Sequence, residues 1–223
     1  MTELTIDDYI QLLATGAPAE RRNAAWMLGR MRDMRIIEPL IQAVGDPDQD
    51  TRFRVVEALG NIKDQEIVPH LILALSDDDL RVRAQAILSL GNQRDYRALE
   101  PLLVLLGDGE AIIRASAIQA LYHVPDRRAI MPLINVLASD PDADNRHYAA
   151  RTLVQIGGED VVNALDMLLL ADPDPDLQIR SAEMLAELGF SSAIPILERL
   201  TQADDAGVRE TAQWGIEQLR SAS

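Results

Sequence analysis

A phrase that recurs about every 31 residues constrains the fold of this chain more than any other feature. Each copy places a proline at the start of an apolar run: IIEPLIQAV (36–44), IVPHLILAL (67–75), ALEPLLVLL (98–106), AIMPLINVL (129–137) and AIPILERL (193–200). A fixed period of about 20–50 residues is typical of solenoids, in which one supersecondary unit stacks on the next. The chain is therefore expected to be a stack of repeats.

Each phrase has the pattern of a short amphipathic helix. Apolar residues recur three, four and seven positions after the first, as in Leu99, Leu102, Leu103 and Leu106, and so share one helical stripe. The proline lies near the helix start, where its missing N–H costs least. The segment TIDDYIQLLAT keeps this spacing without the proline, and VVNALDMLLLA has Ala164 in its place.

A second phrase follows each first one, with an arginine, a small residue three positions later, and a small and an apolar residue six and seven positions later. The arginines are Arg21, Arg52, Arg83, Arg114, Arg146, Arg180 and Arg209. Small residues let helices approach closely. We predict an all-α fold, an α-solenoid superhelix of about seven helix pairs in a single domain (1–223), with repeats at approximately 5–34, 35–65, 66–96, 97–127, 128–159, 160–191 and 192–220.

An acidic turn joins the two phrases of almost every repeat, and two copies resemble calcium loops. DPDQDTRFRVVE (46–57) and DPDPDLQIRSAE (172–183) have aspartates at positions one, three and five and glutamate at position twelve. However, Thr51 and Leu177 replace the glycine that the sixth position needs, and Glu57 and Glu183 would lie two turns down a helix. We therefore expect no metal and interpret the aspartates as helix caps.

An aspartate also stands six residues before the arginine in five successive repeats. In a stack these residues would form a column of alternating charge, with each arginine able to reach the aspartate of its own or a neighbouring repeat. This structural ladder comprises Asp46 and Arg52, Asp77 and Arg83, Asp108 and Arg114, Asp140 and Arg146, and Asp174 and Arg180.

These features together resemble a known family. A proline in the first helix, with Asp and Arg six apart around the start of the second, resembles the HEAT repeat. VRAQAILSLG (82–91) and, more loosely, IRASAIQALY (113–122) are similar to the HEAT-like subclass named after phycobilisome lyase subunits. The resemblance covers almost all of residues 5–220 and implies the solenoid architecture. Its members differ in function and include phycobilin lyases, proteins that detach those pigments, scaffolds and adaptors.

Two enzymatic relatives of this architecture are not supported by the residues. Deoxyhypusine hydroxylase carries His-Glu pairs for a di-iron centre, whereas here His70, His123 and His147 are followed by Leu, Val and Tyr. HEAT-like DNA glycosylases need a cationic concave face, whereas 36 acidic and 21 basic residues give a formal charge of −15. That charge repels nucleic acid and anionic lipid, so we expect neither as a partner.

The chain has no cysteine and no apolar run of about 18 residues, so we expect a cytoplasmic protein without thiolate chemistry or a membrane span.

Candidate partner-binding residues come from the second helices, which usually line the concave side of such a solenoid. Positions one, five and nine after each repeat arginine are expected to point outward. Trp, Tyr and Arg are common anchors of protein interfaces. Alternatively, the two tryptophans cover the ends of the core and the histidines make ordinary surface hydrogen bonds. The candidates are Arg22, Trp26, Phe53, Glu57, Gln119, His123, His147, Tyr148, Arg151 and Trp214.

No nucleophile with its base, phosphate loop or pair of catalytic carboxylates stands out from the repeats, so we assign no catalytic residue and expect no cofactor. The leading hypothesis is a non-enzymatic scaffold or adaptor for protein–protein interaction, whose partner carries basic patches. The alternative is a phycobilin lyase-type protein, which attaches a bilin to a phycobiliprotein or detaches it. A bilin is expected only under that alternative.

Overall fold

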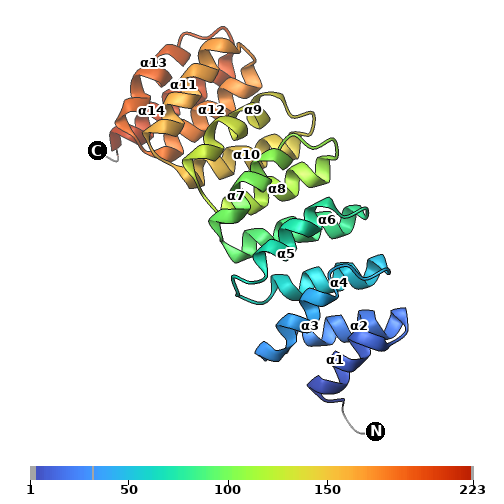
Figure 1. Cartoon of the computed structure of the whole chain (residues 1–223). Coiled ribbons are helices and arrows are strands. Elements are labelled where there is room, and N and C mark those ends of the chain that lie inside the picture. The colour runs from blue at the N-terminus through green and yellow to red at the C-terminus, as the bar shows by residue number, and fades with distance from the viewer. Residues whose placement is uncertain (1–3, 32, 222–223) are drawn as a thin grey trace. The chain divides into compact units, whose positions relative to one another are not determined.

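A computed structural model describes residues 4–31 and 33–221, and every regular element within them is a helix (Figure 1). The α-helices are α1 (Ile6–Thr15), α2 (Pro18–Leu28), α3 (Ile37–Gln42), α4 (Gln49–Gly60), α5 (Val68–Leu73), α6 (Leu80–Gln93), α7 (Leu99–Leu105), α8 (Ala111–His123), α9 (Ile130–Ser139), α10 (Ala143–Ile156), α11 (Glu159–Ala171), α12 (Pro175–Leu188), α13 (Ile194–Leu200) and α14 (Ala206–Ser221). Short 3₁₀ helices are η1 (Met34–Ile36), η2 (Ala74–Ser76), η3 (Tyr96–Ala98), η4 (Arg127–Ala129) and η5 (Ser191–Ala193). None of the helices in these residues is long and apolar enough to cross a membrane.

The α-helices form consecutive pairs, one pair for each predicted repeat, and the predicted all-α solenoid of helix pairs is confirmed. Contacts divide the chain into two compact units. The N-terminal unit (residues 1–124) holds the pairs from α1 to α8, and the C-terminal unit (residues 125–223) holds those from α9 to α14. The prediction that all repeats belong to one domain stays a prediction.

The acidic turns start the second helices, as the capping interpretation predicts. The carboxylate of Asp48 accepts the N–H of Thr51 at 2.9 Å, and that of Asp79 accepts the N–H of Arg81 at 2.8 Å. Asp174 likewise accepts the N–H of Leu177 at 3.1 Å. Such caps satisfy donors that the first helical turn leaves open, and each stabilises by about 0.5–2 kcal/mol.

Leucines at equivalent positions of successive repeats form the centre of each unit. Leu71 of α5 and Leu102 of α7 are fully buried, as are Leu90 of α6 and Leu121 of α8. Burying one such side chain contributes about 1.5–3 kcal/mol. The predicted stripe along the first helices is largely buried. Its later positions differ between repeats, since Leu106, Ile134 and Leu137 are buried whereas Ile41 and Ile72 are only partly buried.

Small residues bring the second helices of the N-terminal unit together, and α2, α4, α6 and α8 pack in one row (Figure 1). Gly29, directly after α2, faces Ala58, Gly60 of α4 faces Ser89, and Gly91 of α6 faces Ala120. A Cβ atom on Gly91 would lie 2.8 Å from the Cα atom of Ala120, closer than two carbons can approach. The backbone of the next helix therefore occupies the space of a side chain.

We expect Gly91→Val to destabilise the protein by about 1–3 kcal/mol, because the new side chain must push α6 away from α8. Gly109→Val is the control, since nothing lies within 4 Å of a Cβ atom at that turn. Urea unfolding followed by circular dichroism measures both variants. Equal losses from the two substitutions would contradict the close approach.

Candidate functional site

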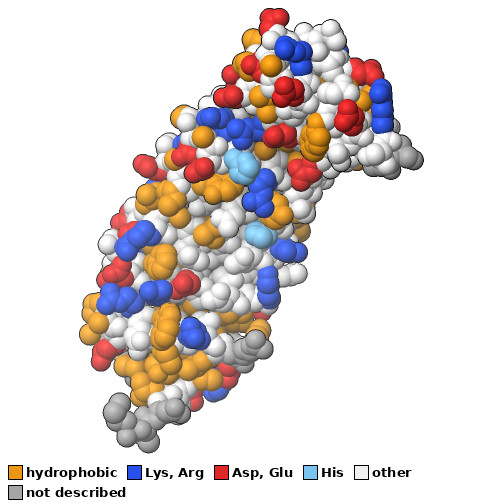
Figure 2. All heavy atoms as spheres, turned by 180° about the vertical axis from the view of Figure 1, so that it is seen from behind, with side chains coloured by type: hydrophobic (Ala, Val, Ile, Leu, Met, Phe, Trp, Pro, Cys, Tyr) orange, Lys and Arg blue, Asp and Glu red, His pale blue; other side chains and the backbone are white. Residues whose placement is uncertain are grey.

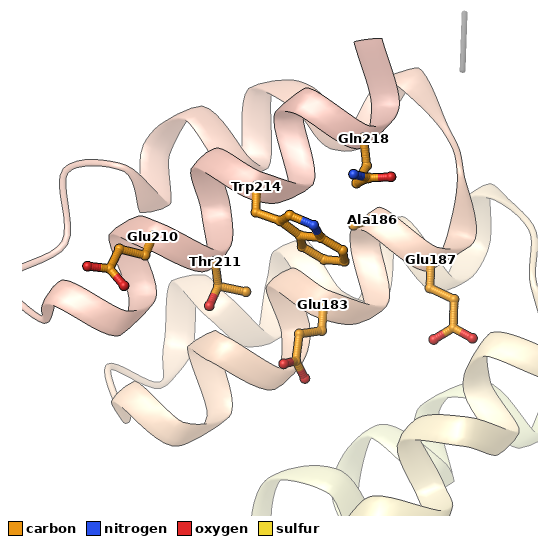
Figure 3. Close-up of a pocket in the computed structure, with 7 residues that line it drawn as sticks. All are labelled: Glu183, Ala186, Glu187, Glu210, Thr211, Trp214 and Gln218. Atoms are coloured by element: carbon orange, nitrogen blue, oxygen red, sulfur yellow. The ribbon is translucent and has the colours of Figure 1, made fainter. Parts of the chain in front are cut away.

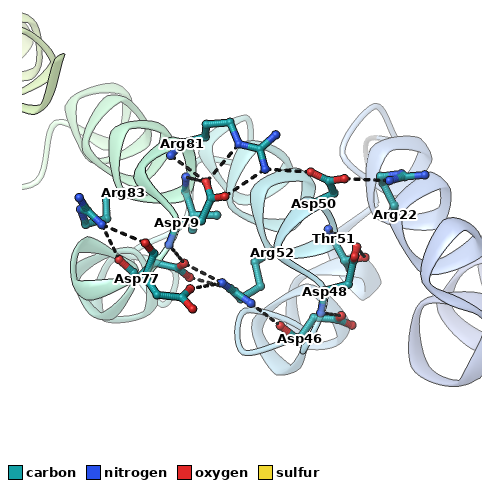
Figure 4. A network of polar contacts seen from close by, with 12 residues as sticks. Arg22, Asp46, Asp48, Asp50, Thr51, Arg52, Asp77, Asp79, Arg81 and Arg83 are labelled. Carbon is teal, nitrogen blue, oxygen red and sulfur yellow. Dashed lines mark hydrogen bonds and ion pairs between the residues drawn. The ribbon is translucent and has the colours of Figure 1, made fainter.

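Arginines tie successive second helices into place in the N-terminal unit (Figure 4). The guanidinium of Arg21 donates to both carboxylate oxygens of Asp46, at 2.7 and 2.8 Å, and to the main-chain oxygen of Gly16 at 3.0 Å. Arg52 repeats this arrangement with the carboxylate of Asp77, at 2.7 and 2.8 Å, and with the main-chain oxygen of Asp46 at 3.0 Å. Each arginine thus joins its own turn to the next repeat through a bidentate ion pair.

The main-chain part of this arrangement recurs in the following repeats. The next arginines keep the bond to the main chain six residues earlier, at 2.8 Å for Arg83, 2.9 Å for Arg114 and 2.7 Å for Arg146. Arg83 makes no bond to the carboxylate of Asp108 among the residues that the structure describes. Within one repeat the arginine therefore bonds a main-chain oxygen, whereas the carboxylate partners of Arg21 and Arg52 come from the neighbouring repeat, one of the two options that the sequence allowed.

Repeat six departs from the predicted ladder. Asp174 caps α12, whereas the carboxylate of Asp172 accepts the N–H two residues on at 3.0 Å, as that of Asp140 does at 2.9 Å. The residue six positions after Asp172 is Gln178, and buried positions of α12 follow it in the usual order. Asp174 and Arg180 therefore stand two residues after the positions equivalent to Asp140 and Arg146, and their pairing stays a prediction. The uneven arginine spacing around Arg180 was the signal of this shift.

Aromatic and charged side chains of α2 and α4 lie on the outward face of the N-terminal unit. The guanidinium of Arg30 lies over the ring of Trp26, 5.0 Å from its centre, and that of Arg54 lies 5.4 Å from the centre of Phe53. Arg54 also pairs with Glu57 at 2.7 Å. The indole of Trp26 is 41% exposed, so packing alone does not account for it.

Asp50 links two arginines on this face. Arg22 donates to one of its carboxylate oxygens and Arg81 to the other, each at 3.0 Å (Figure 4). The sequence analysis identified Arg22 but not Asp50 or Arg81, because neither occupies a position that the repeat pattern singles out. These arginines are therefore already neutralised by acids of the same surface.

The remaining candidates belong to α8 and α10. Gln119 is exposed, and the ring of His123 lies 5.6 Å from that of Tyr122, edge to face. On α10, His147, Tyr148 and Arg151 are all exposed, and the first two rings are 6.2 Å apart. His123 lies in the N-terminal unit and His147 in the C-terminal unit, so their predicted grouping stays a prediction. Within the described residues, no three His, Asp or Glu side chains converge as a metal site requires.

Trp214 of α14 is 47% exposed and lines a hollow beside α12 (Figure 3). Glu183 and Glu187 of α12 face it from the other side. Sequence reasoning missed these two glutamates because it left the register of repeat six unassigned. Across the protein, hydrophobic, basic and acidic side chains are interspersed on the face that Figure 2 shows.

A second polar motif, which the sequence analysis also missed, opens several first helices. Asp33, Asp95 and Asp126 each accept the N–H of the arginine two residues later, at 2.9 Å. The side chains of Arg35, Arg97 and Arg128 bond the same carboxylates and hold the pKa of these aspartates below its ordinary value of 3.8. The turns at both ends of a repeat are therefore built on charged aspartates.

Comparisons with known proteins agree with this architecture. The family model for HEAT repeats matches residues 6–81, 68–133, 99–176 and 130–217. No curated protein matches the chain in sequence. Among solved structures, the chain is similar to the complex of CpcE and CpcF of phycocyanin lyase from Nostoc sp. PCC7120, with 23% identity and a TM-score of 0.63 over 100% of this chain and 93% of that one.

Two further structures share the fold. One is the archaeal HEAT-like repeats protein from Thermococcus onnurineus NA1, with 17% identity and a TM-score of 0.55 over 100% of this chain and 99% of that one. The other is a designed armadillo repeat protein, with 19% identity and a TM-score of 0.55 over 96% of this chain and 100% of that one. At such identities the likeness concerns the fold alone.

We expect Arg52→Ala to destabilise the protein by about 3 kcal/mol, because it leaves the nearly buried carboxylate of Asp77 without its main counterion. The side chains of this pair are 13% and 9% exposed. Arg35→Ala serves as the control, since its side chain is 58% exposed and its loss should cost at most about 1 kcal/mol. Thermal and urea unfolding measure both. An Arg52 variant as stable as the control would show that the bridge contributes little.

Proposed function

Since the chain belongs to the HEAT-repeat family, we propose that it is a non-enzymatic scaffold or adaptor that holds a protein partner along the outward face of its second helices. The exposed aromatic side chains of that face carry the proposal. Trp26, Tyr148 and Trp214 are 41%, 43% and 47% exposed, although burial in the core would stabilise each of them. Large amphipathic rings kept at a surface are typical anchors of protein interfaces.

The charge of the chain narrows the class of partner. A formal charge of −15 attracts surfaces that carry basic patches, and it speeds encounter with them. Such attraction is screened by salt over about 8–10 Å, so binding is expected to weaken as salt rises. The side chains that would make contact in the C-terminal unit include Arg151 and His147, which adds polar specificity to the aromatic anchors.

We expect Trp26→Ala and Arg151→Ala to reduce capture of a partner from the native lysate, each by about tenfold, as is typical of interface anchors. Tyr96→Ala and Arg127→Ala are matched controls, because these residues are 78% and 74% exposed and lie outside the second helices. Tyr96 belongs to η3 and Arg127 to η4, which precede the first helices of their repeats. Affinity purification with quantitative mass spectrometry measures the captured amounts. If no captured protein responds to either test variant more than to its control, the proposal fails.

A phycobilin lyase-type function is the second candidate, supported by the likeness to the phycocyanin lyase complex over the whole of this chain. Under it, the chain would attach a bilin to a phycobiliprotein or detach it, together with a second subunit. Co-expression with a phycobiliprotein and a bilin, followed by absorbance, distinguishes the candidates. We expect no transfer or release of pigment if the chain is an adaptor, and an absorbance change in either direction would favour the lyase.

A further inference from the structure

A hollow of about 710 Å³ lies between α12 and α14 of the C-terminal unit (Figure 3). The indole ring of Trp214 projects into it, with Glu183 and Glu187 on the neighbouring helix and Glu210 one turn away on the same helix as the ring. The hollow is lined by Glu183, Ala186 and Glu187 of α12 and by Glu210, Thr211, Trp214 and Gln218 of α14.

The register of the two helices explains why these side chains meet. Glu210, Trp214 and Gln218 are one helical turn apart on α14, at positions one, five and nine after Arg209. Glu183 and Glu187 are five and nine positions after Gln178, so α12 presents the equivalent face. Residues four apart lie one above the other on a helix, and α12 packs against α14. The shifted register of repeat six thus places two carboxylates opposite an exposed indole.

The carboxylates of this hollow lack counterions. Within residues 4–31 and 33–221, those of Glu183, Glu187 and Glu210 accept no hydrogen bond and form no ion pair. Nearby acids of the same unit differ, since Asp166 pairs with Arg199 and Glu198 pairs with Arg220. The whole C-terminal unit has seventeen acidic residues against eight basic ones. Acidic side chains therefore predominate around the ring, although Arg209, which bonds main-chain oxygens of Ala203 and Asp204, also lines a second hollow beside Trp214.

A second hollow, of about 420 Å³, adjoins the first at Trp214 and Glu210. It extends toward Gln213 and Glu217 of the same helix, so the indole forms a wall between two depressions. A single small cation would occupy only one of them. An extended peptide segment could lie across both and keep its basic side chains beside the ring.

We propose that this groove docks an arginine-bearing segment of the protein partner, with one guanidinium on the face of Trp214 and its N–H groups donating to the surrounding glutamates. The inference rests on the proposed function and specifies the partner's chemistry. Indole is the aromatic ring that attracts cations most strongly. Arginine fits better than lysine, because its planar group stacks on a ring and bonds carboxylates in pairs.

A second copy of this chain is a less suitable occupant. The arginines beside Trp26 would be the complementary surface, but Arg22 is already bound by Asp50 and Arg30 lies over its own tryptophan. Docking them in the groove would break these contacts before new ones formed. The segment of a separate partner does not carry that cost.

Fluorescence anisotropy of labelled octa-arginine, at about 0.15 M salt, tests the groove on the full chain. The test variant is Glu183→Gln, Glu187→Gln, Glu210→Gln, and the control is Glu38→Gln, Glu66→Gln, Glu110→Gln, which removes the same charge from the N-terminal unit. We expect the test variant to bind about five to ten times more weakly and the control to change less than twofold. Trp214→Leu should also weaken binding, whereas Trp26→Leu should not, and octa-lysine should bind more weakly than octa-arginine.

Several outcomes would overturn the inference. Equal weakening by the two glutamine triples would show general charge attraction without a groove, and unchanged binding by Trp214→Leu would remove the ring from the site. Concentration-dependent sedimentation that the test triple abolishes would assign the groove to a second copy. If the partner captured from lysate binds the test triple normally, the groove is rejected while the proposed function stands. If no partner is captured but the peptide results hold, the groove stands and the proposed function fails.

Discussion

The leucines at the centre of each repeat, such as Leu71 and Leu90, lose all contact with water because neighbouring helix pairs cover them. Two short helices cannot hide their apolar faces from water by themselves, so the repeats are stable only as a stack. Stacking requires neighbouring helices to approach closely. Where α6 meets α8, a glycine (Gly91) faces an alanine (Ala120), so almost no side-chain atoms separate the two helices. The outward face of the second helices is what this packing leaves uncovered.

The helix pairs could be predicted because periodic burial leaves a periodic sequence, and the capping aspartates Asp48, Asp79 and Asp174 could be predicted because an acidic turn precedes most second helices. The register of repeat six could not, since Arg180 imitates the repeat arginine two residues too late while Gln178 holds the equivalent position. The partners of individual side chains were even harder to predict from the sequence. Arg83 and Asp108 occupy the same pattern positions as Arg52 and Asp77, so residue types alone did not indicate that, among the described residues, only the latter pair is bonded.

The same limit applies to the candidate site. Trp26 and Trp214 stood out in the sequence as large side chains at outward positions, but their surroundings differ in a way that spacing did not indicate. Around Trp26, Arg30 contacts the ring, and the neighbouring Arg22 is paired with Asp50. Around Trp214, the glutamates have no such partners. Among the described residues, more acidic charge is thus left without a partner beside Trp214 than beside Trp26.

The bridge from Arg21 to Asp46, and its copy from Arg52 to Asp77, joins positions that recur in each of the early repeats. If one whole repeat were removed or duplicated there, the new junction would again place an arginine opposite the aspartate at the equivalent position of the next repeat. Insertion or deletion of one repeat can thus lengthen or shorten the protein while the same kind of ion pair still joins the neighbouring repeats. Repeat six lacks this junction, because Gln178 stands at the equivalent position and has no guanidinium group.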